Sequence, residues 1–232
     1  MKELVPNTLH LYRRKPSAVS IGRYQKIEDV VDAKYCKAQR IDILRRISGG
    51  GTIYTDSNCL EYSIVVDREY SKIPIDLEGS FKVICKGIIK ALGNLGINAY
   101  YKSINDVLVK GKKISGSAQR RSGRILLQHG TLLFDADLEL MSGSLKMRHK
   151  GVKKMEEKLT TIRWEANRVI DIEMASEALK RGFEEVLSMK LMKSRLMPWE
   201  ELRVKELADK YRSKTWVFSH QQCRKTIGVR GS

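Results

Sequence analysis

Three consecutive glycines follow a pair of arginines in the first quarter of the chain. The stretch reads Arg45-Arg46-Ile47-Ser48-Gly49-Gly50-Gly51-Thr52-Ile53-Tyr54. Consecutive glycines allow positive φ angles and a close approach to a ligand, and their N–H groups can converge on an anion. The two arginines can add charge-assisted contacts to a carboxylate or phosphate. The stretch predicts a cradle for a nucleotide or an acyl-adenylate, and the alternative is a flexible turn with solvated arginines.

A second polar segment reads Asn105-Asp106-Val107-Leu108-Val109-Lys110-Gly111-Lys112-Lys113-Ile114-Ser115-Gly116-Ser117-Ala118-Gln119-Arg120. A lysine-bearing turn leads into a strand pattern, and a run of small residues follows it. Strand alternation places Lys112 and Lys113 on different faces, so one ammonium can be held rigidly toward a phosphate or carboxylate oxygen. We predict that Lys113 is this residue; alternatively, these lysines are ordinary turn charges.

A third segment, Gln128-His129-Gly130-Thr131-Leu132-Leu133, sets a polar pair and a glycine within an otherwise apolar strand. A glycine inside a strand often marks the close approach of a ligand or another backbone. His129 is therefore a candidate contact to a ligand, or else a core histidine with satisfied hydrogen bonds.

Short strands and three long helices are expected to position these segments. The strand patterns cover Thr8 to Arg13, Ser17 to Arg23, Leu60 to Val66, Asp106 to Val109 and Ile125 to Phe134. One helix is indicated from Glu78 by the spacing of Phe81, Ile84, Ile88, Leu92 and Leu95, with Gly96 as its stop. A second follows Asp171, which can cap it, and a last helix starts at Pro198.

The last helix carries an apolar stripe of Val204, Leu207, Ala208 and Tyr211, which we expect to pack on the core. Strands and helices do not alternate regularly along the chain. We therefore expect an α+β domain with a mixed, largely antiparallel sheet flanked by helices, and no Rossmann nucleotide site.

Composition narrows the class of protein. The chain has 232 residues, is 42% hydrophobic and carries a formal charge of +17, which suits one sizeable core and anionic partners. No nucleic-acid-binding motif and no apolar run of membrane-spanning length is present, so nucleic acid and membrane are not the expected partners. The N-terminus lacks the pattern of a secretory signal, and we expect a cytoplasmic protein.

Four cysteines are widely spread, at Cys36, Cys59, Cys85 and Cys223. None forms a C-x-x-C pair or has a histidine at metal-ligand spacing, so we interpret them as free thiols. Cys59 is the one cysteine close in sequence to a motif, and it abuts a strand that looks buried. We interpret Cys59 as structural.

Taken together, RRISGGGTIYTD, NDVLVKGKKISGSAQRR and LQHGTLLFDADL resemble, in this order and spacing, the lipoate-protein ligase family. The flanking segments KPSAVSIGRYQ and KLTTIRWEANRV resemble the family as well. The resemblance covers roughly Thr8 to Phe218 and implies the fold of the biotin/lipoate protein ligase catalytic domain. It implies a catalytic domain over residues 1–218, a tail over residues 219–232 and no accessory domain.

Members of that family form lipoyl-AMP from lipoate and ATP and then pass the lipoyl group to an acceptor lysine. By resemblance, Lys113 serves both steps, in which negative charge develops on oxygen atoms. ATP and lipoate are the implied substrates, and Mg²⁺ is implied at Asp106. The implied contacts to ATP or the lipoyl-adenylate are Arg46, Ser48, Gly49, Gly50, Gly51, Thr52, Ile53, Tyr54, Asn105, Asp106, Ser115, Gly116, Ser117, Ala118 and His129.

The implied partners are lipoyl-acceptor domains, namely the E2 subunits of 2-oxoacid dehydrogenases and the H protein of glycine cleavage. Such domains are commonly acidic, so the basic surface would speed their encounter. The lysine-rich stretch from His149 to Lys154 lies where the family has a loop that closes over the adenylate, although a solvated basic loop has the same pattern.

Two departures from the family keep alternatives open. The first is that the family's additional N-terminal strand and helix have no counterpart before Thr8. The second is that single-chain ligases continue into a C-terminal accessory domain, which we do not expect here. A separate subunit would have to replace that domain. The main alternative is ATP-independent transfer of octanoyl or lipoyl from a carrier protein through a cysteine thioester. One branch of such transferases carries its cysteine just before the match to Asn105, and residues 98–104 contain none.

Two further hypotheses rank lower. A biotin ligase performs the same two-step chemistry, but its arginine-glycine loop differs from SGGGT. A basic binding protein that kept the fold without the enzymatic activity would show salt-sensitive DNA binding and form no adenylate.

Overall fold

A six-stranded antiparallel sheet is the framework of the computed structural model, which describes residues 6–69, 73–146 and 151–218. The strands follow the order β1-β5-β9-β8-β7-β6. Their bounds are β1 (Thr8–Tyr12), β5 (Cys59–Asp67), β9 (Ile125–Leu133), β8 (Lys112–Ser122), β7 (Asp106–Val109) and β6 (Tyr100–Lys102). The two longest pairings join β9 to β5 and to β8, so the second and third motifs lie on neighbouring strands.

A second, three-stranded sheet carries the glycine-rich motif. It has the order β3-β2-β4 and consists of β2 (Ala18–Ile21), β3 (Asp42–Arg45) and β4 (Ile53–Thr55). β2 is parallel to β3 and antiparallel to β4. The described residues therefore form an α+β domain with mixed, largely antiparallel sheets, which confirms the predicted fold class.

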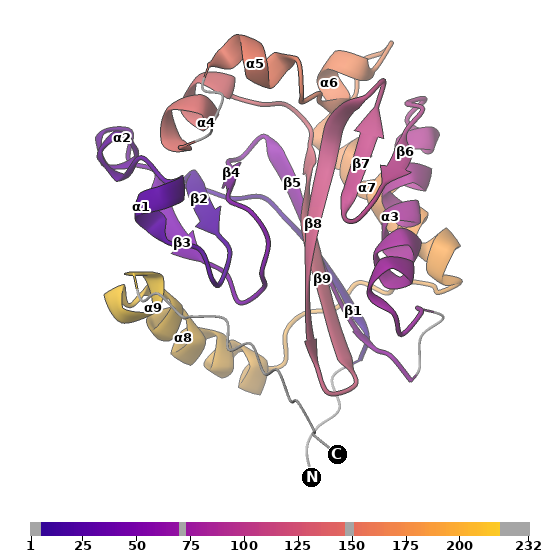
Figure 1. Ribbon diagram of the computed structural model, residues 1–232. Coiled ribbons are helices and arrows are strands. Elements are labelled where there is room, and N and C mark those ends of the chain that lie inside the picture. The colour runs from indigo at the N-terminus through magenta and orange to yellow at the C-terminus, as the bar shows by residue number, and fades with distance from the viewer. Residues whose placement is uncertain (1–5, 70–72, 147–150, 219–232) are drawn as a thin grey trace, which may run out of the picture.

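Helices cover both faces of the six-stranded sheet (Figure 1). Their bounds are α1 (Ile27–Val30), α2 (Ala33–Ala38), α3 (Leu77–Asn94), α4 (Leu138–Ser144), α5 (Val152–Glu156), α6 (Ile162–Glu165), α7 (Ile172–Leu187), α8 (Pro198–Arg212) and α9 (Lys214–Phe218). α3 and α7 pack on one face, while the small sheet, α4 and α5 lie on the other. None of the helices in the described ranges is long and apolar enough to cross a membrane.

α3 begins where its sequence indicates. Asp76 caps it by accepting a hydrogen bond from Gly79 N at 2.7 Å. The predicted apolar face is buried: Ile84, Ile88 and Leu92 are each 0% exposed. Burying such a side chain stabilises the fold by about 1.5–3 kcal/mol. α3 thereby fixes the position of the sheet that carries the second motif.

α7 packs against α3 at very close range. A Cβ on Gly87 would lie 2.4 Å from the Phe183 ring, so only glycine fits there. Asp171 caps α7 by accepting from Met174 N at 2.7 Å, as predicted. These contacts form the rigid back of the six-stranded sheet.

α8 starts at Pro198, as predicted, but the expectation that its apolar stripe packs on the core is wrong. No residue of α8 is buried, and Val204 is 53% exposed. Leu207, Ala208 and Tyr211 are half-buried. The rings of Tyr211 and of Trp216 in α9 are in edge contact, with their centroids 5.0 Å apart. The stripe is therefore only partly covered, by the short helix α9, and otherwise faces solvent.

Candidate active site

A cavity of about 600 Å³ lies between the two sheets. Its walls come from β4, from β7, β8 and β9, and from α4, α5 and the segment after α5. The predicted site residues that line it are Thr52, Ile53, Tyr54, Asp106, Lys113, Ser115 and Gly116. Thr131 and Leu133 of the third motif line it as well, so all three motifs, far apart in sequence, share one cavity.

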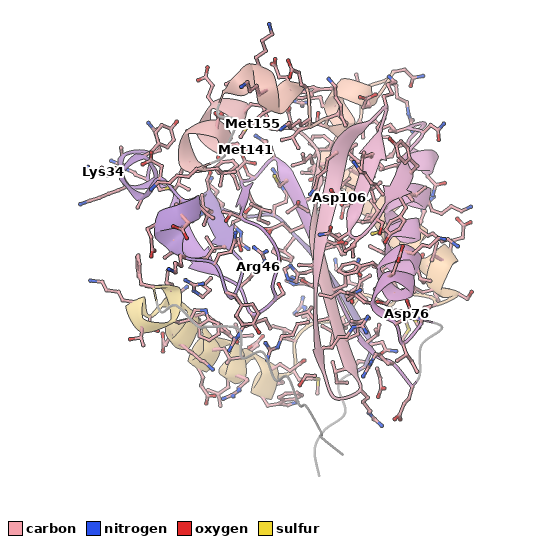
Figure 2. All side chains as sticks on the ribbon, in the orientation of Figure 1. Lys34, Arg46, Asp76, Asp106, Met141 and Met155 are labelled. Atoms are coloured by element: carbon pink, nitrogen blue, oxygen red, sulfur yellow. The ribbon has the colours of Figure 1, made fainter. Side chains whose placement is uncertain are left out.

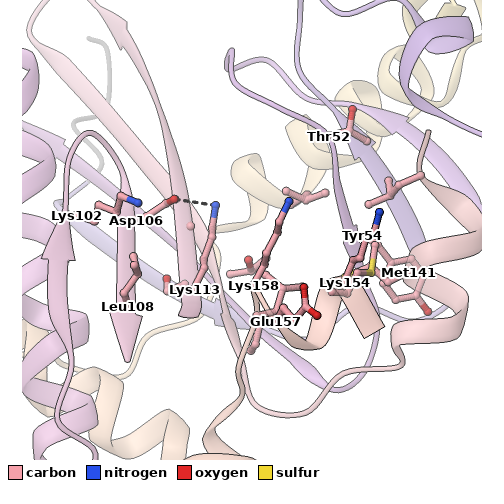
Figure 3. Close-up of a pocket in the computed structure, with 18 of the residues that line it drawn as sticks. Thr52, Tyr54, Lys102, Asp106, Leu108, Lys113, Met141, Lys154, Glu157 and Lys158 are labelled. Atoms are coloured by element: carbon pink, nitrogen blue, oxygen red, sulfur yellow. Dashed lines mark ion pairs between the residues drawn. The ribbon is translucent and has the colours of Figure 1, made fainter. Parts of the chain in front are cut away.

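Lys113 extends from β8 into this cavity and pairs with Asp106. Its Nζ lies 2.7 Å from Asp106 Oδ1, and the two side chains are 39% and 29% exposed (Figure 3). Asp106 is opposite Gly116 in the β7–β8 pairing. A Cβ on Gly116 would lie 2.5 Å from Lys113 Cε and 2.6 Å from Nζ. Glycine at this position is therefore what leaves room for the ammonium.

Ser115 places an unpartnered hydroxyl beside that lysine. The residue is 2% exposed, and its Oγ has no hydrogen-bond partner within the described protein. A buried polar atom without a partner costs about 1–3 kcal/mol. Ser115 also lines the cavity, so a polar ligand atom seated there would remove the penalty.

Arg46 holds the glycine-rich loop together. Its guanidinium donates to the carbonyl oxygens of Ser20 at 2.9 Å, Gly49 at 2.8 Å and Gly51 at 2.6 Å. Burial lowers the pKa of Arg46 to about 10. In this arrangement the arginine clamps the loop and does not line the cavity. Gly50, at φ +93°, takes the left-handed conformation that a three-glycine run allows.

Arg45 does not serve as an anion contact, contrary to the interpretation of the arginine pair. It is 4% exposed and donates to Val217 O at 2.9 Å and to three carbonyls of the loop after β2, those of Gly22, Arg23 and Gln25. The physical reason is that the buried guanidinium already donates to these carbonyl oxygens and so has no exposed N–H group for a ligand.

His129 is tied to the same loop. Its Nε2 lies 2.6 Å from Ser48 Oγ. Burial, and then the charge of Arg46, lower the pKa of His129 to about 4. The imidazole is therefore neutral near pH 7, so it brings no positive charge to a phosphate. What it does is join β9 of the large sheet to the glycine loop.

Three predicted site residues of the second motif support the cavity without lining it, namely Asn105, Ser117 and Ala118. Asn105 Nδ2 donates to Ser117 O at 2.5 Å, and Ser117 N and Oγ both donate to Asn105 O. A Cβ on Gly50 would lie 3.9 Å from the Ala118 Cβ, so β8 supports the glycine loop there. Nine of the predicted site residues do not line the cavity, namely Arg46, Ser48, Gly49, Gly50, Gly51, Asn105, Ser117, Ala118 and His129.

Several functional candidates were missed by sequence reasoning. Lys102, Lys146 and Lys158 line the cavity together with Lys154, which lies in the predicted basic stretch. Figure 3 shows Lys113, Lys154 and Lys158 pointing the same way. His149 and Lys150 of that stretch lie outside the described residues. Nothing local distinguishes Lys158 from a solvated lysine, so the signal is only its position in three dimensions.

Part of the cavity lining is apolar. Val30, Met141, Leu145 and Met155 contribute to it, and Figure 2 shows Met141 and Met155 next to one another, apart from Arg46. Methionine is flexible and polarisable and adapts to irregular apolar ligands. The cavity therefore offers apolar side chains suited to a hydrocarbon chain as well as several lysines.

Magnesium at Asp106 stays a prediction, since Mg²⁺ can be held by a single carboxylate together with substrate phosphates. Oδ1 of Asp106 is already 2.7 Å from the ammonium of Lys113, which would repel a dication. The described residues contain no group of three or more His, Cys, Asp or Glu side chains that could hold a metal. What the structure shows for Asp106 is the ion pair with Lys113.

The described cysteines are not activated thiols. Cys36, Cys59 and Cys85 are all buried. Burial raises the pKa of all three thiols, to about 12 for Cys59 and about 11 for Cys85. Cys85 Sγ lies 3.9 Å from Ser117 Oγ, behind the cavity wall. Cys223 lies outside the described residues.

A family model and similar sequences both point to proteins that attach lipoyl or octanoyl groups. The family model of the lipoyl protein ligase A/B catalytic domain matches residues 1–184. An octanoyltransferase LipM from Geobacillus kaustophilus is 31% identical, over 92% of this chain and 87% of its own. That name agrees with the alternative of octanoyl transfer better than with ATP-dependent ligation.

Solved structures with the same fold include ligases. A bipartite lipoate protein ligase from Thermoplasma acidophilum is 28% identical, with a TM-score of 0.83 over 94% of this chain and 86% of that one. A lipoate-protein ligase A bound with ATP is also 28% identical, with a TM-score of 0.81 over 92% and 86%.

Proposed function

The chain belongs to the family of the lipoyl protein ligase A/B catalytic domain, and we propose that it activates lipoate with ATP and transfers the lipoyl group to a lysine of an acceptor domain. One observation carries the proposal. Lys113, paired with Asp106, and Ser115, whose hydroxyl has no partner in the described protein, line one cavity that also has apolar side chains.

In this proposal the apolar side chains take the acyl chain, and its carboxyl group lies beside Lys113 and Ser115. Lys102, Lys154 and Lys158 also line the cavity, and in this proposal they face the phosphates of ATP. Fixed cations stabilise oxygens that gain negative charge without reorganising during the reaction. Cations placed in this way can stabilise a carboxylate oxygen as well as a phosphate oxygen.

Adenylation then proceeds by attack of a lipoate oxygen on the α-phosphorus, with pyrophosphate leaving. Transfer proceeds by attack of the acceptor amine on the acyl carbonyl, with AMP leaving and the amine losing a proton. Lys113 stabilises the oxyanion in both steps, and Asp106 keeps its ammonium in place. The glycine loop, clamped by Arg46 and tied to His129 through Ser48, borders the adenylate.

The proposed acceptors are lipoyl domains of E2 subunits and the H protein of glycine cleavage. The similar ligase from Thermoplasma acidophilum is described as bipartite and was studied with its E2 lipoyl domain. We propose that an accessory subunit takes part here as well.

Octanoyl transfer from a carrier protein is the second candidate, and the names of the relatives favour it. It requires a thiolate near Lys113. The three cysteines that the structure describes are buried with raised pKa values, so this route would rest on Cys223. The adenylate route needs no thiol, and for that reason it comes first.

The test follows acceptor mass together with AMP and pyrophosphate. Purified protein is incubated with an acceptor domain and either ATP, Mg²⁺ and lipoate, or an octanoyl carrier-protein thioester without ATP, each with and without an accessory subunit. The variants are Lys113→Ala, Cys223→Ser and the control Lys86→Ala, an exposed lysine of α3 on the opposite face of the large sheet.

We expect an ATP-dependent mass gain that falls by ~10²- to 10³-fold in Lys113→Ala and is unchanged in Cys223→Ser and Lys86→Ala. Modification from the thioester alone, lost in Cys223→Ser, would instead establish the transferase.

A further inference from the structure

The main chain of Lys113 is held by the segment that follows α5. Lys113 N donates to Lys158 O at 2.8 Å, and Thr160 N donates to Lys113 O at 3.0 Å. Together they form a short parallel bridge between Lys113 and Leu159. The backbone from which the ammonium extends is therefore fixed by residues outside the large sheet.

Glu165, at the end of α6, fastens this segment. Thr160 Oγ1 donates to Glu165 Oε1 at 2.7 Å, and Lys110 Nζ lies 2.9 Å from Oε2. The glutamate side chain is only 10% exposed. Burial by itself would raise its pKa, but the hydrogen bonds from Lys110 and Thr160 and the charges of Lys110 and Lys112 lower it. The carboxylate is thus charged and held from two sides.

The two partners of Glu165 lie on either side of Lys113. Lys110 sits in the β7–β8 turn at φ +48°, just before Lys113 in the chain. Thr160 belongs to the segment paired with Lys113. One carboxylate therefore closes a ring of contacts that runs from the turn, through Glu165 and Thr160, back to the Lys113 carbonyl.

The same ring anchors α5 above the cavity. Lys158 N and Leu159 N donate to Met155 O at 2.9 and 2.8 Å, which joins the end of α5 to the segment beside Lys113. Lys154 of α5 and Lys158 both line the cavity (Figure 3). A shift of the anchored segment would therefore move the cavity cations relative to one another.

We propose that Glu165 is a positioning residue, which through Thr160 and Lys110 sets Lys113 and the α5 lysines at their places around the cavity. This inference rests on the role of Lys113 proposed above. Reacting groups must be placed closely, and a misplacement of about 1 Å can cost ~10²-fold in rate. Glu165 touches no substrate and acts only through its neighbours.

The experiment compares Glu165→Ala, which loses both contacts, with Glu165→Gln, which keeps an acceptor for Thr160 but loses the charge facing Lys110. Glu177→Gln is the matched control, because Glu177 pairs with Lys180 and Arg181 on the outer side of α7. Single-turnover rates of acyl-AMP formation and KM values for ATP and lipoate are measured. Hydrogen exchange at the amides of Lys113 and Thr160 reports on the bridge without any activity.

We expect Glu165→Ala to lower the single-turnover rate by ~10-fold or more, with both KM values changed by less than about twofold and faster exchange at both amides. Glu165→Gln should recover part of the rate, and Glu177→Gln should match the wild type.

Two outcomes separate this inference from the proposed function. An active wild type with unchanged rate and exchange in Glu165→Ala would overturn the positioning role alone. A wild type that forms no acyl-AMP would overturn the proposed function, and the exchange of the two amides would still decide whether Glu165 fastens the bridge. Loss of rate that follows only the loss of folded protein in a thermal melt would reduce Glu165 to a structural residue.

Discussion

Lys113 and Asp106 meet over Gly116, where the backbone leaves no space for a side chain. We expect Gly116→Ala to push the ammonium away from Asp106 and lower the turnover rate by ~10- to 10²-fold. The fold should persist, because the displaced atoms are the far end of a flexible lysine. Turnover and thermal unfolding are measured side by side.

Gly93→Ala serves as the control for that substitution. A Cβ there would meet nothing within 4 Å, and the residue lies inside α3. Alanine is preferred over glycine in a helix by up to about 1 kcal/mol, so Gly93→Ala should be slightly more stable and fully active. Equal activity in the two alanine variants would contradict the importance of the space over Gly116.

His129 gives the protein a pH-dependent stability. Its pKa falls from 6.5 to about 4 on folding, so the unfolded chain binds the proton more readily. The contribution of neutral His129 to the free energy of unfolding is fully present above pH ~6.5. It is lost as the pH falls toward 4, by about 1.4 kcal/mol per pH unit at most. Urea unfolding at pH 7 and pH 5 should show a smaller loss in His129→Gln than in the wild type.

His10→Gln is the comparison for this measurement, because His10 is exposed and lies on the edge strand β1. If His10→Gln and His129→Gln lose stability in parallel between the two pH values, the lowered pKa of His129 is not the cause.

At the scale of elements, α9 is connected to the glycine loop through Arg45. Trp216 Nε1 donates to Arg45 O at 2.8 Å, and Arg45 Nε donates to Val217 O. Removing one such hydrogen bond costs about 1 kcal/mol. We expect Trp216→Phe to lower the free energy of unfolding by that amount and to weaken ATP binding, since the next residue after Arg45 is the loop clamp Arg46.

Trp199→Phe makes the same chemical change on α8, where Trp199 is 41% exposed. Denaturant unfolding and a nucleotide titration should leave it indistinguishable from the wild type. An effect as large as that of Trp216→Phe would mean that the indole contact to Arg45 is unimportant.

Elements with strong local signals were predicted well. The cap Asp171 and the buried spacing along α3 follow from neighbouring residues, because a helix begins where its first N–H groups find an acceptor. The cap Asp76 was not predicted. The stripe of α8 has the same kind of spacing, yet it is not buried. Periodicity predicts which side chains share a face, whereas burial depends on what other elements leave uncovered.

At the scale of the whole molecule, the net charge of +17 predicts salt-sensitive encounter with an acidic acceptor. We expect the second-order rate of transfer to fall by about tenfold as ionic strength rises from ~0.05 to ~0.5 M. Formation of acyl-AMP measured without acceptor should change far less, because small substrates are positioned by contacts inside the cavity. A transfer rate that stays constant across this range would exclude electrostatic steering.

The sequence by itself was enough to predict the α+β class, to locate the three motifs and to name Lys113 as the candidate lysine, because each depends on residues that are close along the chain. Only the tertiary structure decided how the motifs are used. It committed Arg45 and Arg46 to backbone carbonyls, tied His129 to Ser48, and brought Lys102, Lys146 and Lys158 to one cavity. It also revealed Glu165 beside Thr160 and Lys110. These are contacts between distant segments, which no local pattern encodes, since they exist only once the two sheets have packed.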